Sequence, residues 1–376
     1  MKSVIQFSLM TALLATLAAC SLSPDKPRPA VLPAPAALIG TPLIIWSAQV
    51  GATPANVLPR AVRDRLFTVG AGGKAVLALD ANSGREVWRV MFSAPVTAGV
   101  GTDGDMVAVV TQENELVGMV AGEVRWRQRL TASVYTAPLV AGRRVFVSTA
   151  DRTVQAFDAE NGRRLWSQSR NGDPLVLSQS GVLLAVGNTL VVGLAGRLVG
   201  LDPINGSTRW DVPIATGRGT NEIERLTDLV GPASRVESSI CVRAYASAIG
   251  CVDAQRGTVV WTRAARGMVG LGGDEQLVFG TESDGRLLAW RRDTGQIVWS
   301  MDRLLNRQLG VALVLGKDMV VVGDSSGLVH LVSREDGSEL ARLMTDNAPI
   351  LSSPMQLDST LLVQTHKGGV FAWRLQ

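Results

Sequence analysis

The alternation of apolar and polar residues between Leu77 and Trp88 recurs along most of the chain and predicts a repeated β-hairpin. The segment reads Leu-Ala-Leu-Asp-Ala-Asn-Ser-Gly-Arg-Glu-Val-Trp. Its first residues predict a half-buried strand. The Asp and the Gly fit a tight turn into the next strand, since Asp can hydrogen-bond the turn backbone and Gly readily takes a positive φ. The same frame, with a Gly four residues before a Trp, returns at 156–166, 200–210, 251–261 and 289–299.

Two weaker copies extend the series to eight anchor positions. One copy ends at Trp126, and the other ends at Ala341, where the frame expects a Trp. The anchors then stand at positions 46, 88, 126, 166, 210, 261, 299 and 341. Units of four short strands with a period of about 40 residues are typical of β-propeller blades. We therefore predict an all-β, eight-bladed β-propeller, in which each Trp packs between neighbouring blades because a lone hairpin cannot bury an indole.

The two ends of the repeat series are complementary. Trp46 follows only the short apolar run 43–45, whereas the last unit, 369–373, has strands but no anchor after it. We expect the N-terminal strand to be the outer strand of the last blade, which closes the ring and removes a free sheet edge. An open β-solenoid is the alternative, although it would not need complementary ends.

The N-terminal residues 1–19 are expected to be a signal peptide. Lys2 precedes an apolar run that is too short to span a bilayer, and small residues come before Cys20. The sequence Leu-Ala-Ala-Cys at 17–20 resembles a bacterial lipobox. That resemblance implies cleavage before Cys20 and its acylation, with fatty acids such as palmitate, and Ser21 favours sorting to the outer membrane. An ordinary secretory signal with a coincidental cysteine is the alternative.

The next segment, 20–40, is predicted to be a lipidated cysteine followed by an extended tether. Residues 41–376 are predicted to form the propeller. Prolines prevent helix formation and sheet pairing in the tether. They stand at positions 24, 27, 29, 33 and 35.

Composition agrees with many strands and turns and does not indicate nucleic-acid binding. Apolar residues make up 46% of the 376 residues, and 39 are Gly. The formal net charge is +4, but the arginines are spread through turns without interleaved aromatic residues. Together with the predicted export signal, this pattern argues against a nucleic-acid partner.

No catalytic or metal-binding constellation is predicted. The two histidines, His330 and His366, occupy strand-like positions without a matching cluster of acids or cysteines nearby in the sequence. The glycine-rich pieces 101–104 and 270–273 lack a strand-to-helix context and are interpreted as turns. Four aspartates are likewise expected to be turn residues: Asp80, Asp158, Asp202 and Asp253.

Cys241 and Cys251 are expected on adjacent strands of one hairpin. Aligning 241–251 with the repeat at 146–156 gives that placement. The spacing allows either a cross-strand disulfide or two buried thiols.

The long step between Trp210 and Trp261 contains an insertion at 213–232. Thr220 could cap a short helical turn there. A long loop of mixed charge on a rigid scaffold is a natural binding element, and a length-tolerant excursion without function is the alternative.

The run 218–228, the lipobox and the eight repeats together resemble the BamB family of outer-membrane protein assembly factors. The resemblance implies a non-enzymatic lipoprotein without a cofactor, anchored in the outer membrane with its body in the periplasm. It implies membership of the β-barrel assembly machinery (the BAM complex), docking onto the POTRA domains of BamA, and assistance to nascent outer-membrane proteins. Exposed outer strands could also pair with extended client chains by β-augmentation.

In that family the docking patch combines an Arg-Leu-Ser-Asp-Val-Asp-like loop with a Leu-x-Leu-Arg segment one blade earlier. The partner-binding residues that the resemblance implies in this chain are Leu175, Leu177, Arg225, Leu226 and Asp228. At two positions where the family pattern has a charged residue, this chain instead has Ser178 and Val230. The apolar half of the contact is therefore the firmer expectation.

Two other functional classes fit parts of the sequence. The repeats are also similar to those of pyrroloquinoline-quinone (PQQ) dehydrogenases, whose propellers bind the cofactor and a calcium ion on the ring axis. Those enzymes are generally longer, many place adjacent bonded cysteines against the cofactor, and no acid cluster suited to calcium stands out here. A lipoprotein scaffold of another envelope complex is the third interpretation.

Overall fold

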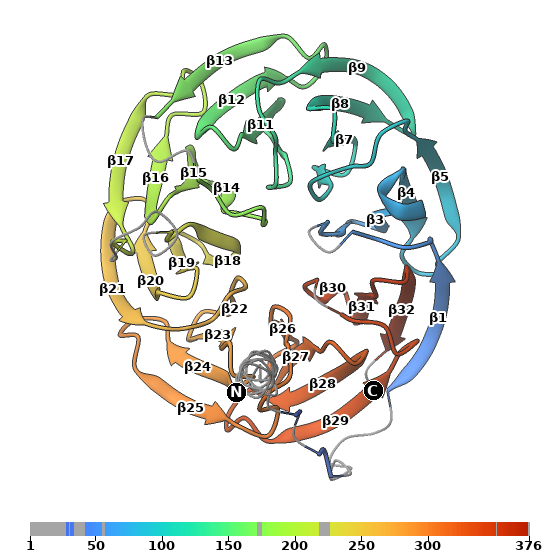
Figure 1. Cartoon of the computed structure of the whole chain (residues 1–376), viewed down its shortest axis with the longest axis vertical. Helices are drawn as coiled ribbons and strands as arrows, with labels where there is room; N and C mark the ends of the chain where they lie inside the picture. Colours follow the sequence, from blue (N-terminus) through green and yellow to red (C-terminus); the bar gives the residue numbers. More distant parts are fainter. Residues whose placement is uncertain are drawn as a thin grey trace, which may run out of the picture.

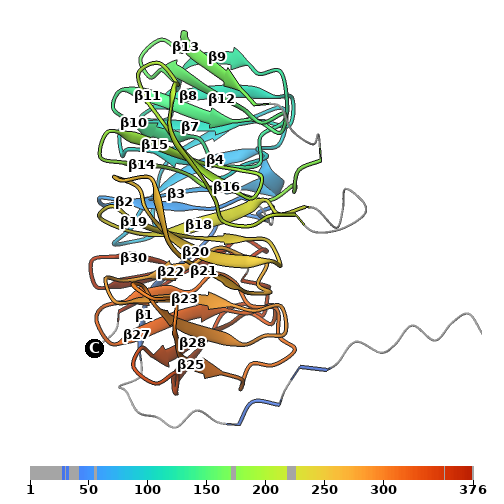
Figure 2. The same ribbon diagram turned by 90° about the vertical axis from the view of Figure 1, so that its left-hand side faces the viewer.

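The computed structural model describes residues 28–29, 31–33, 42–54, 57–170, 175–217, 226–350 and 352–374. In this part the chain forms eight four-stranded antiparallel sheets, arranged as blades around a central axis (Figure 1). Seen from the side, the blades form a disc (Figure 2). The predicted eight-bladed propeller is confirmed, and the solenoid alternative is wrong.

The blades are numbered from the first complete one, and each is given from its inner to its outer strand. Blade 1 is β2 (Arg60–Val62), β3 (Arg65–Gly70), β4 (Ala75–Asp80) and β5 (Glu86–Met91). Blade 2 is β6 (Gly101–Thr102), β7 (Met106–Val110), β8 (Glu115–Val120) and β9 (Glu123–Arg129). Blade 3 is β10 (Leu139–Ala141), β11 (Arg144–Ser148), β12 (Thr153–Asp158) and β13 (Arg164–Ser169). Blade 4 is β14 (Leu183–Val186), β15 (Thr189–Leu194), β16 (Arg197–Leu201) and β17 (Thr208–Pro213).

The second half of the ring repeats the arrangement. Blade 5 is β18 (Leu229–Val236), β19 (Ser239–Ala244), β20 (Ala248–Asp253) and β21 (Thr258–Ala264). Blade 6 is β22 (Gly272–Gly273), β23 (Leu277–Thr281), β24 (Leu287–Arg291) and β25 (Ile297–Met301). Blade 7 is β26 (Leu313–Leu315), β27 (Met319–Gly323), β28 (Leu328–Ser333) and β29 (Glu339–Met344). Blade 8 is β30 (Met355–Leu357), β31 (Thr360–Gln364), β32 (Gly369–Arg374) and β1 (Leu43–Gln49).

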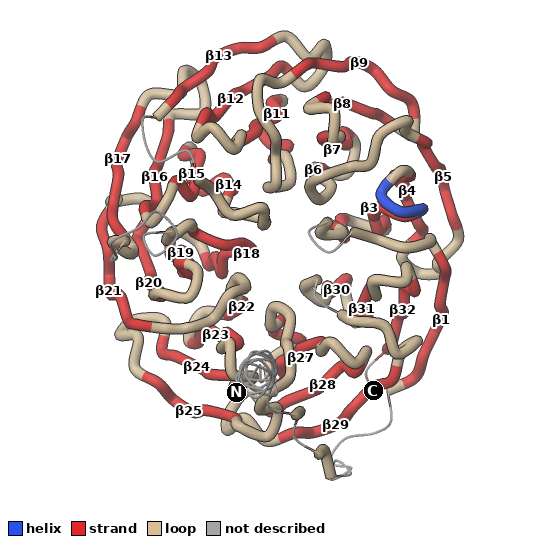
Figure 3. The backbone as a smooth tube through the Cα atoms, in the orientation of Figure 1, coloured by secondary structure: helices blue, strands red, loops and turns tan. Residues whose placement is uncertain are grey.

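Ring closure follows the prediction from the chain ends. Strand β1 lies outside β32 and pairs with it antiparallel, with Trp46 opposite Ala372 (Figure 1). Within the described residues the only helical element is the single turn Ala71–Gly73, so the architecture rests on strands and turns (Figure 3). No helix in that part of the chain is long and apolar enough to cross a membrane.

The repeated turn works as the sequence predicts. The Asp80 carboxylate accepts hydrogen bonds from the backbone N–H groups of Asn82 and Ser83, at 3.2 and 2.9 Å. Gly84 closes the turn with a φ of +70°. The equivalent aspartates Asp158, Asp202 and Asp253 accept the same kind of bond. These carboxylates are therefore turn residues.

Each anchor tryptophan packs against the turn of the next blade, as predicted. The Trp46 indole N–H donates to the Ala81 carbonyl at 3.0 Å, and its ring lies so close to Gly84 that a Cβ there would be 2.4 Å away. The turn glycine is thus required both for its backbone conformation and for the indole beside it. Four further anchors donate to the following blade: Trp126, Trp166, Trp261 and Trp299.

The missing anchor at Ala341 has a topological explanation. Ala341 lies on β29, the outer strand of blade 7, so a tryptophan there would need the turn between the third and outer strands of blade 8. Those two strands are β32 and β1, which are distant in sequence and share no hairpin. Without a receiving turn, an indole at this position would lack its carbonyl acceptor and its glycine.

The apolar cores lie between blades rather than within them. One cluster combines Val69 and Val76 of blade 1 with Val107 and Val117 of blade 2, all at most 1% exposed. Because every blade covers the face of the next, ring closure also completes the burial of blades 8 and 1.

The connectors, which lead from an outer strand to the inner strand of the next blade, carry the predicted insertion. Pro213 ends β17 and Leu229 begins β18, so the connector is 214–228, shorter than the predicted 213–232. Thr220 and Arg225 lie outside the described residues, as do the predicted signal peptide and Cys20. Part of the predicted tether is described: the Arg28 carbonyl accepts a hydrogen bond from the Asn306 side chain at 3.2 Å.

The expectation that no acid accompanies the histidines is wrong for His330. Its ring lies between Asp324 and Glu339, with Nε2 at 3.2 Å from Asp324 Oδ2 and Nδ1 at 3.0 Å from Glu339 Oε1. All three side chains are fully buried, and Arg307 and Arg342 pair with the two carboxylates. The sequence obscured this cluster because a β-bulge in the pairing of β28 with β29 and a turn bring the acids to the ring.

The two carboxylates flank opposite ring nitrogens, so the cluster is a buried ionic network within blade 7. Burial by itself would lower the pKa of His330, but the hydrogen bonds to Asp324 and Glu339 raise it above its usual range. The pKa values of both carboxyls are lowered despite burial, by His330 and, for Glu339, also by Arg342.

The tryptophan contact predicts a difference between two matched substitutions. Trp261→Phe removes an indole N–H that donates to the Arg292 carbonyl at 2.7 Å, whereas the Trp210 N–H has no partner in the described structure. Trp261→Phe should therefore lower the free energy of unfolding by about 1 kcal/mol more than Trp210→Phe, measured by urea denaturation. Equal losses at both positions would contradict a stabilising role for the inter-blade hydrogen bond.

The buried histidine predicts a pH dependence. Because the pKa of His330 is raised on folding, its stabilising contribution is complete below about pH 6.5, the unfolded value, and is lost as the pH rises through the folded-state pKa. The stability gap between wild type and His330→Gln, from urea denaturation between about pH 5 and 9, should therefore narrow as the pH increases.

His366→Gln is the matched control for this experiment. Burial lowers the pKa of His366, so wild type should lose stability relative to this variant as the pH falls below about 6.5. If the difference in unfolding free energy between wild type and His330→Gln did not change with pH, the buried network would not retain the proton on His330.

Candidate functional site

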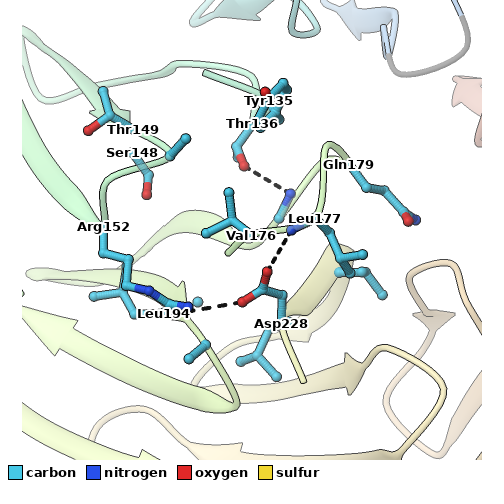
Figure 4. A pocket seen from close by; sticks show the side chains of 16 residues that line it. Tyr135, Thr136, Ser148, Thr149, Arg152, Val176, Leu177, Gln179, Leu194 and Asp228 are labelled. Carbon is cyan, nitrogen blue, oxygen red and sulfur yellow. Dashed lines mark hydrogen bonds and ion pairs between the residues drawn. The ribbon is translucent and has the colours of Figure 1, made fainter. Parts of the chain in front are cut away.

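Two neighbouring connectors hold the described candidate binding residues. Leu175 and Leu177 lie between β13 and β14, and Leu226 and Asp228 lie between β17 and β18. The Leu177 backbone N–H donates to Asp228 Oδ2 at 2.8 Å, which ties the connectors together (Figure 4). The structure thus brings both halves of the sequence-based site to one place, while Arg225 lies outside the described residues.

Arg152 is a member of the site that sequence reasoning missed. Its guanidinium lies 3.9 Å from Asp228 Oδ1 and donates to the Leu175 carbonyl at 3.2 Å. The Arg152 and Asp228 side chains are only 10% and 16% exposed, so solvent screens the pair weakly. Arg152 comes from the turn between β11 and β12 of blade 3, and no local pattern connects it with either connector.

The Asp228 carboxylate therefore organises the chain itself. One oxygen accepts from Leu177 and the other faces Arg152, so its negative charge is compensated within the ring. A third connector joins the cluster, because the Thr136 hydroxyl accepts a hydrogen bond from the Gly181 N–H at 2.9 Å (Figure 4). The polar groups hold the connectors in a fixed arrangement.

The apolar side chains of the site are partly exposed. Leu175 is 37% exposed, and Leu177 and Leu226 are half-buried. Ser178 is exposed, whereas Val230 is 1% exposed and belongs to β18. Position 230 therefore serves the propeller core in this chain, so it cannot present the second acid that the family pattern expects.

The cavity beneath the connectors is small. It has a volume of about 70 Å³ and is lined by Tyr135, Thr136, Arg152, Leu177 and Asp228, among others (Figure 4). This volume suits a few water molecules rather than an organic ligand. The site is consequently better suited to binding a protein surface than a small molecule.

A larger cavity of about 400 Å³ lies along the inner strands, where the similarity of the repeats to PQQ dehydrogenases would place a cofactor. Among the described residues, its lining is mostly small, apolar or prolyl, such as Pro59, Pro138, Pro232 and Pro354, and Arg60 is the one charged residue. The described lining contains no carboxylate, although calcium requires oxygen ligands and usually carboxylates. The residues present therefore do not fit a calcium–quinone site, and no group of three or more His, Cys, Asp or Glu side chains in the described chain is arranged to hold a metal ion.

Cys241 and Cys251 are direct partners in the register of β19 and β20 and are joined by a disulfide. Both residues are fully buried. Of the two possibilities that the sequence left open, the structure has the bonded form.

Comparisons with known proteins agree with this architecture. The sequence profile described as outer membrane protein assembly factor BamB matches residues 45–301. A protein of that name from Bordetella pertussis is 33% identical over 96% of this chain and 95% of its own length. Another from Burkholderia pseudomallei is 32% identical over 88% of this chain and 87% of its own length.

Solved structures show the same fold. The crystal structure of BamB from Moraxella catarrhalis has a TM-score of 0.80 at 22% identity, and the match covers 89% of this chain and all of that one. The quinohemoprotein alcohol dehydrogenase from Comamonas testosteroni has a TM-score of 0.68 at 14% identity over 89% of this chain and 76% of its own. The profile match and the identity to curated relatives, rather than the fold, decide between them: the chain belongs to the family of outer membrane protein assembly factor BamB.

Proposed function

We propose that the protein is a non-catalytic scaffold of the outer-membrane β-barrel assembly complex that binds the POTRA domains of BamA. Membership of the BamB family supports a role in outer-membrane protein assembly. The observation that carries the binding site is the hydrogen bond from Leu177 to Asp228, which fixes the two leucine-bearing connectors side by side.

The proposed interface has an apolar centre. Leu175, Leu177 and Leu226 provide partly exposed aliphatic surface on connectors that internal polar bonds already hold in place. A preorganised surface loses little conformational entropy on binding, so more of the apolar burial contributes to affinity. Arg225 is proposed to orient the partner by polar pairing at the rim.

The proposal includes the position of the protein in the envelope. The lipobox-like sequence at 17–20 supports cleavage of a signal peptide, residues 1–19, and acylation of Cys20. Several acyl chains together would hold the protein in the outer membrane. A proline-rich tether, 20–40, would then link the anchor to a propeller, 41–376, in the periplasm, and BamA would connect it with the rest of the complex.

We also propose that outer blade strands offer transient pairing to nascent outer-membrane proteins. Such strands have an unpaired edge, and those of blades 5 and 6 expose Val260 and Ile297 by 51% and 54%. The outer strand of blade 4, β17, has no large exposed apolar side chain.

Substitution of the leucines tests the BamA interface. A tagged Leu175→Glu/Leu226→Glu double variant should recover less than about one tenth of the BamA that wild type recovers from detergent-solubilised envelopes, because charges replace the apolar centre. Ile204→Glu is the control, since Ile204 is 63% exposed on the turn after β16, at the opposite end of the strands. Circular dichroism and thermal unfolding would verify that all variants fold.

The results of this co-purification test the proposed function and the proposed binding site separately. If wild type recovers no BamA, the proposed function is wrong, and the recovered partners would reveal a scaffold of another envelope complex. Equal recovery by wild type and the double variant would keep the function but rule out this interface.

The client proposal has its own test. A photocrosslinking amino acid at position 260 should capture newly made outer-membrane proteins in cells, whereas the same group at Arg209 on β17 should capture few. Equal labelling at both positions would indicate random contact.

A further inference from the structure

The connector between β21 and β22, 265–271, carries two exposed side chains that the sequence-based site does not include. Met268 is 43% exposed, and Arg266 is exposed as well. Within the described parts of the connectors, Met268 and Leu175 are the only exposed large apolar side chains. The two lie on neighbouring parts of the ring, because the Gln179 side-chain amide donates to the Met268 carbonyl at 2.7 Å.

Hydrogen bonds join this connector to the candidate site in a closed circuit. Leu177 donates to the Asp228 carboxylate at 2.8 Å, and the Asp228 carbonyl accepts from the Tyr245 N–H at 3.0 Å. In the same turn, the Ala246 N–H donates to the Gly267 carbonyl at 2.9 Å. The Gln179–Met268 bond completes the circuit. We call the four linked segments, 175–181, 226–230, 245–247 and 265–271, the platform.

A buried ion pair supports the platform from below. Arg243 is fully buried and donates to Glu282 Oε1 at 2.8 Å, while Glu282 also accepts the backbone N–H of Arg266. A Cβ on Gly267 would lie 1.7 Å from Arg243 Nη1, so the connector closes over the guanidinium only because residue 267 is a glycine. Loss of either partner would leave an uncompensated buried charge, which strongly destabilises a protein, and Glu282 links this pair to the connector through the Arg266 N–H.

The charges of the platform define the partner that suits it. Its charged residues are Asp228 and Arg266, and Arg152 below compensates Asp228. The Arg266 side chain forms no ion pair with the described part of the chain, so its positive charge is available. Arg266 places this charge on the connector that Gln179, the neighbour of Ser178, contacts.

We propose that Arg266 and Met268 belong to the partner-binding surface, with Met268 extending its apolar centre and Arg266 pairing with a carboxylate of the partner. This inference rests on the proposed function, since it assigns two specificity-determining residues to the same interface. Met and Arg are both enriched in protein interfaces, and the flexible thioether adapts to irregular apolar surfaces. The matching partner surface is apolar and carries an acidic side chain at its edge.

The test is the affinity of the full-length protein for full-length BamA in detergent, measured by surface plasmon resonance. Met268→Glu should raise Kd at least about tenfold, and Arg266→Glu at least about threefold with a weaker dependence on salt. Met268→Leu and Arg266→Lys should stay close to wild type, because they keep the apolar volume or the charge. Ile204→Glu and Arg256→Glu, at exposed turns away from the platform, are the matched controls.

The outcomes distinguish this inference from the proposed function. If wild type does not bind BamA, the proposed function fails and the inference fails with it. If wild type binds, the Leu175→Glu/Leu226→Glu variant does not, and Met268→Glu and Arg266→Glu both remain within twofold of wild type, the interface stands but this inference is overturned. Circular dichroism verifies folding, and both substituted side chains are exposed.

Discussion

The contact between an indole and a glycine of the next blade is the interaction on which the ring depends. Seven of the eight anchor positions carry a tryptophan that packs against the turn glycine of the next blade, and at five of them the indole N–H also donates to a carbonyl of that blade. An error at one turn glycine would affect two blades, because a side chain there would displace the indole of the preceding blade. The repeat is therefore a unit of inter-blade packing more than a unit of hairpin formation.

The elements that local chemistry determines could be predicted from the sequence. Alternating strands, the Asp–Gly turns, the anchor tryptophans and the complementary ends all follow from short-range patterns, and together they define the propeller. Arg152 and the acids around His330 could not be predicted in the same way. They reach their partners through strand register, a bulge and the packing of one blade on another, none of which a single repeat encodes.

The candidate site illustrates the same division. The leucines at 175, 177 and 226 could be placed because a family resemblance supplied their positions. The resemblance implied partner contact for Asp228, and the structure adds that Arg152 and Leu177 contact its carboxylate within the chain. Charge on a loop thus says little about binding until its internal partners have been identified.

The last blade, composed of β30 to β32 and β1, has a consequence for synthesis of the chain. The Trp46 indole donates to Ala81 in the turn of blade 1, which is 35 residues further along the chain. Strand β1 can therefore dock as soon as blade 1 has been made. Its sheet partner, β32, is made more than 300 residues later. An incomplete chain can therefore hold β1 in place while exposing its pairing edge, and only a chain that extends through β32 covers that edge. The final blade therefore distinguishes complete from truncated molecules.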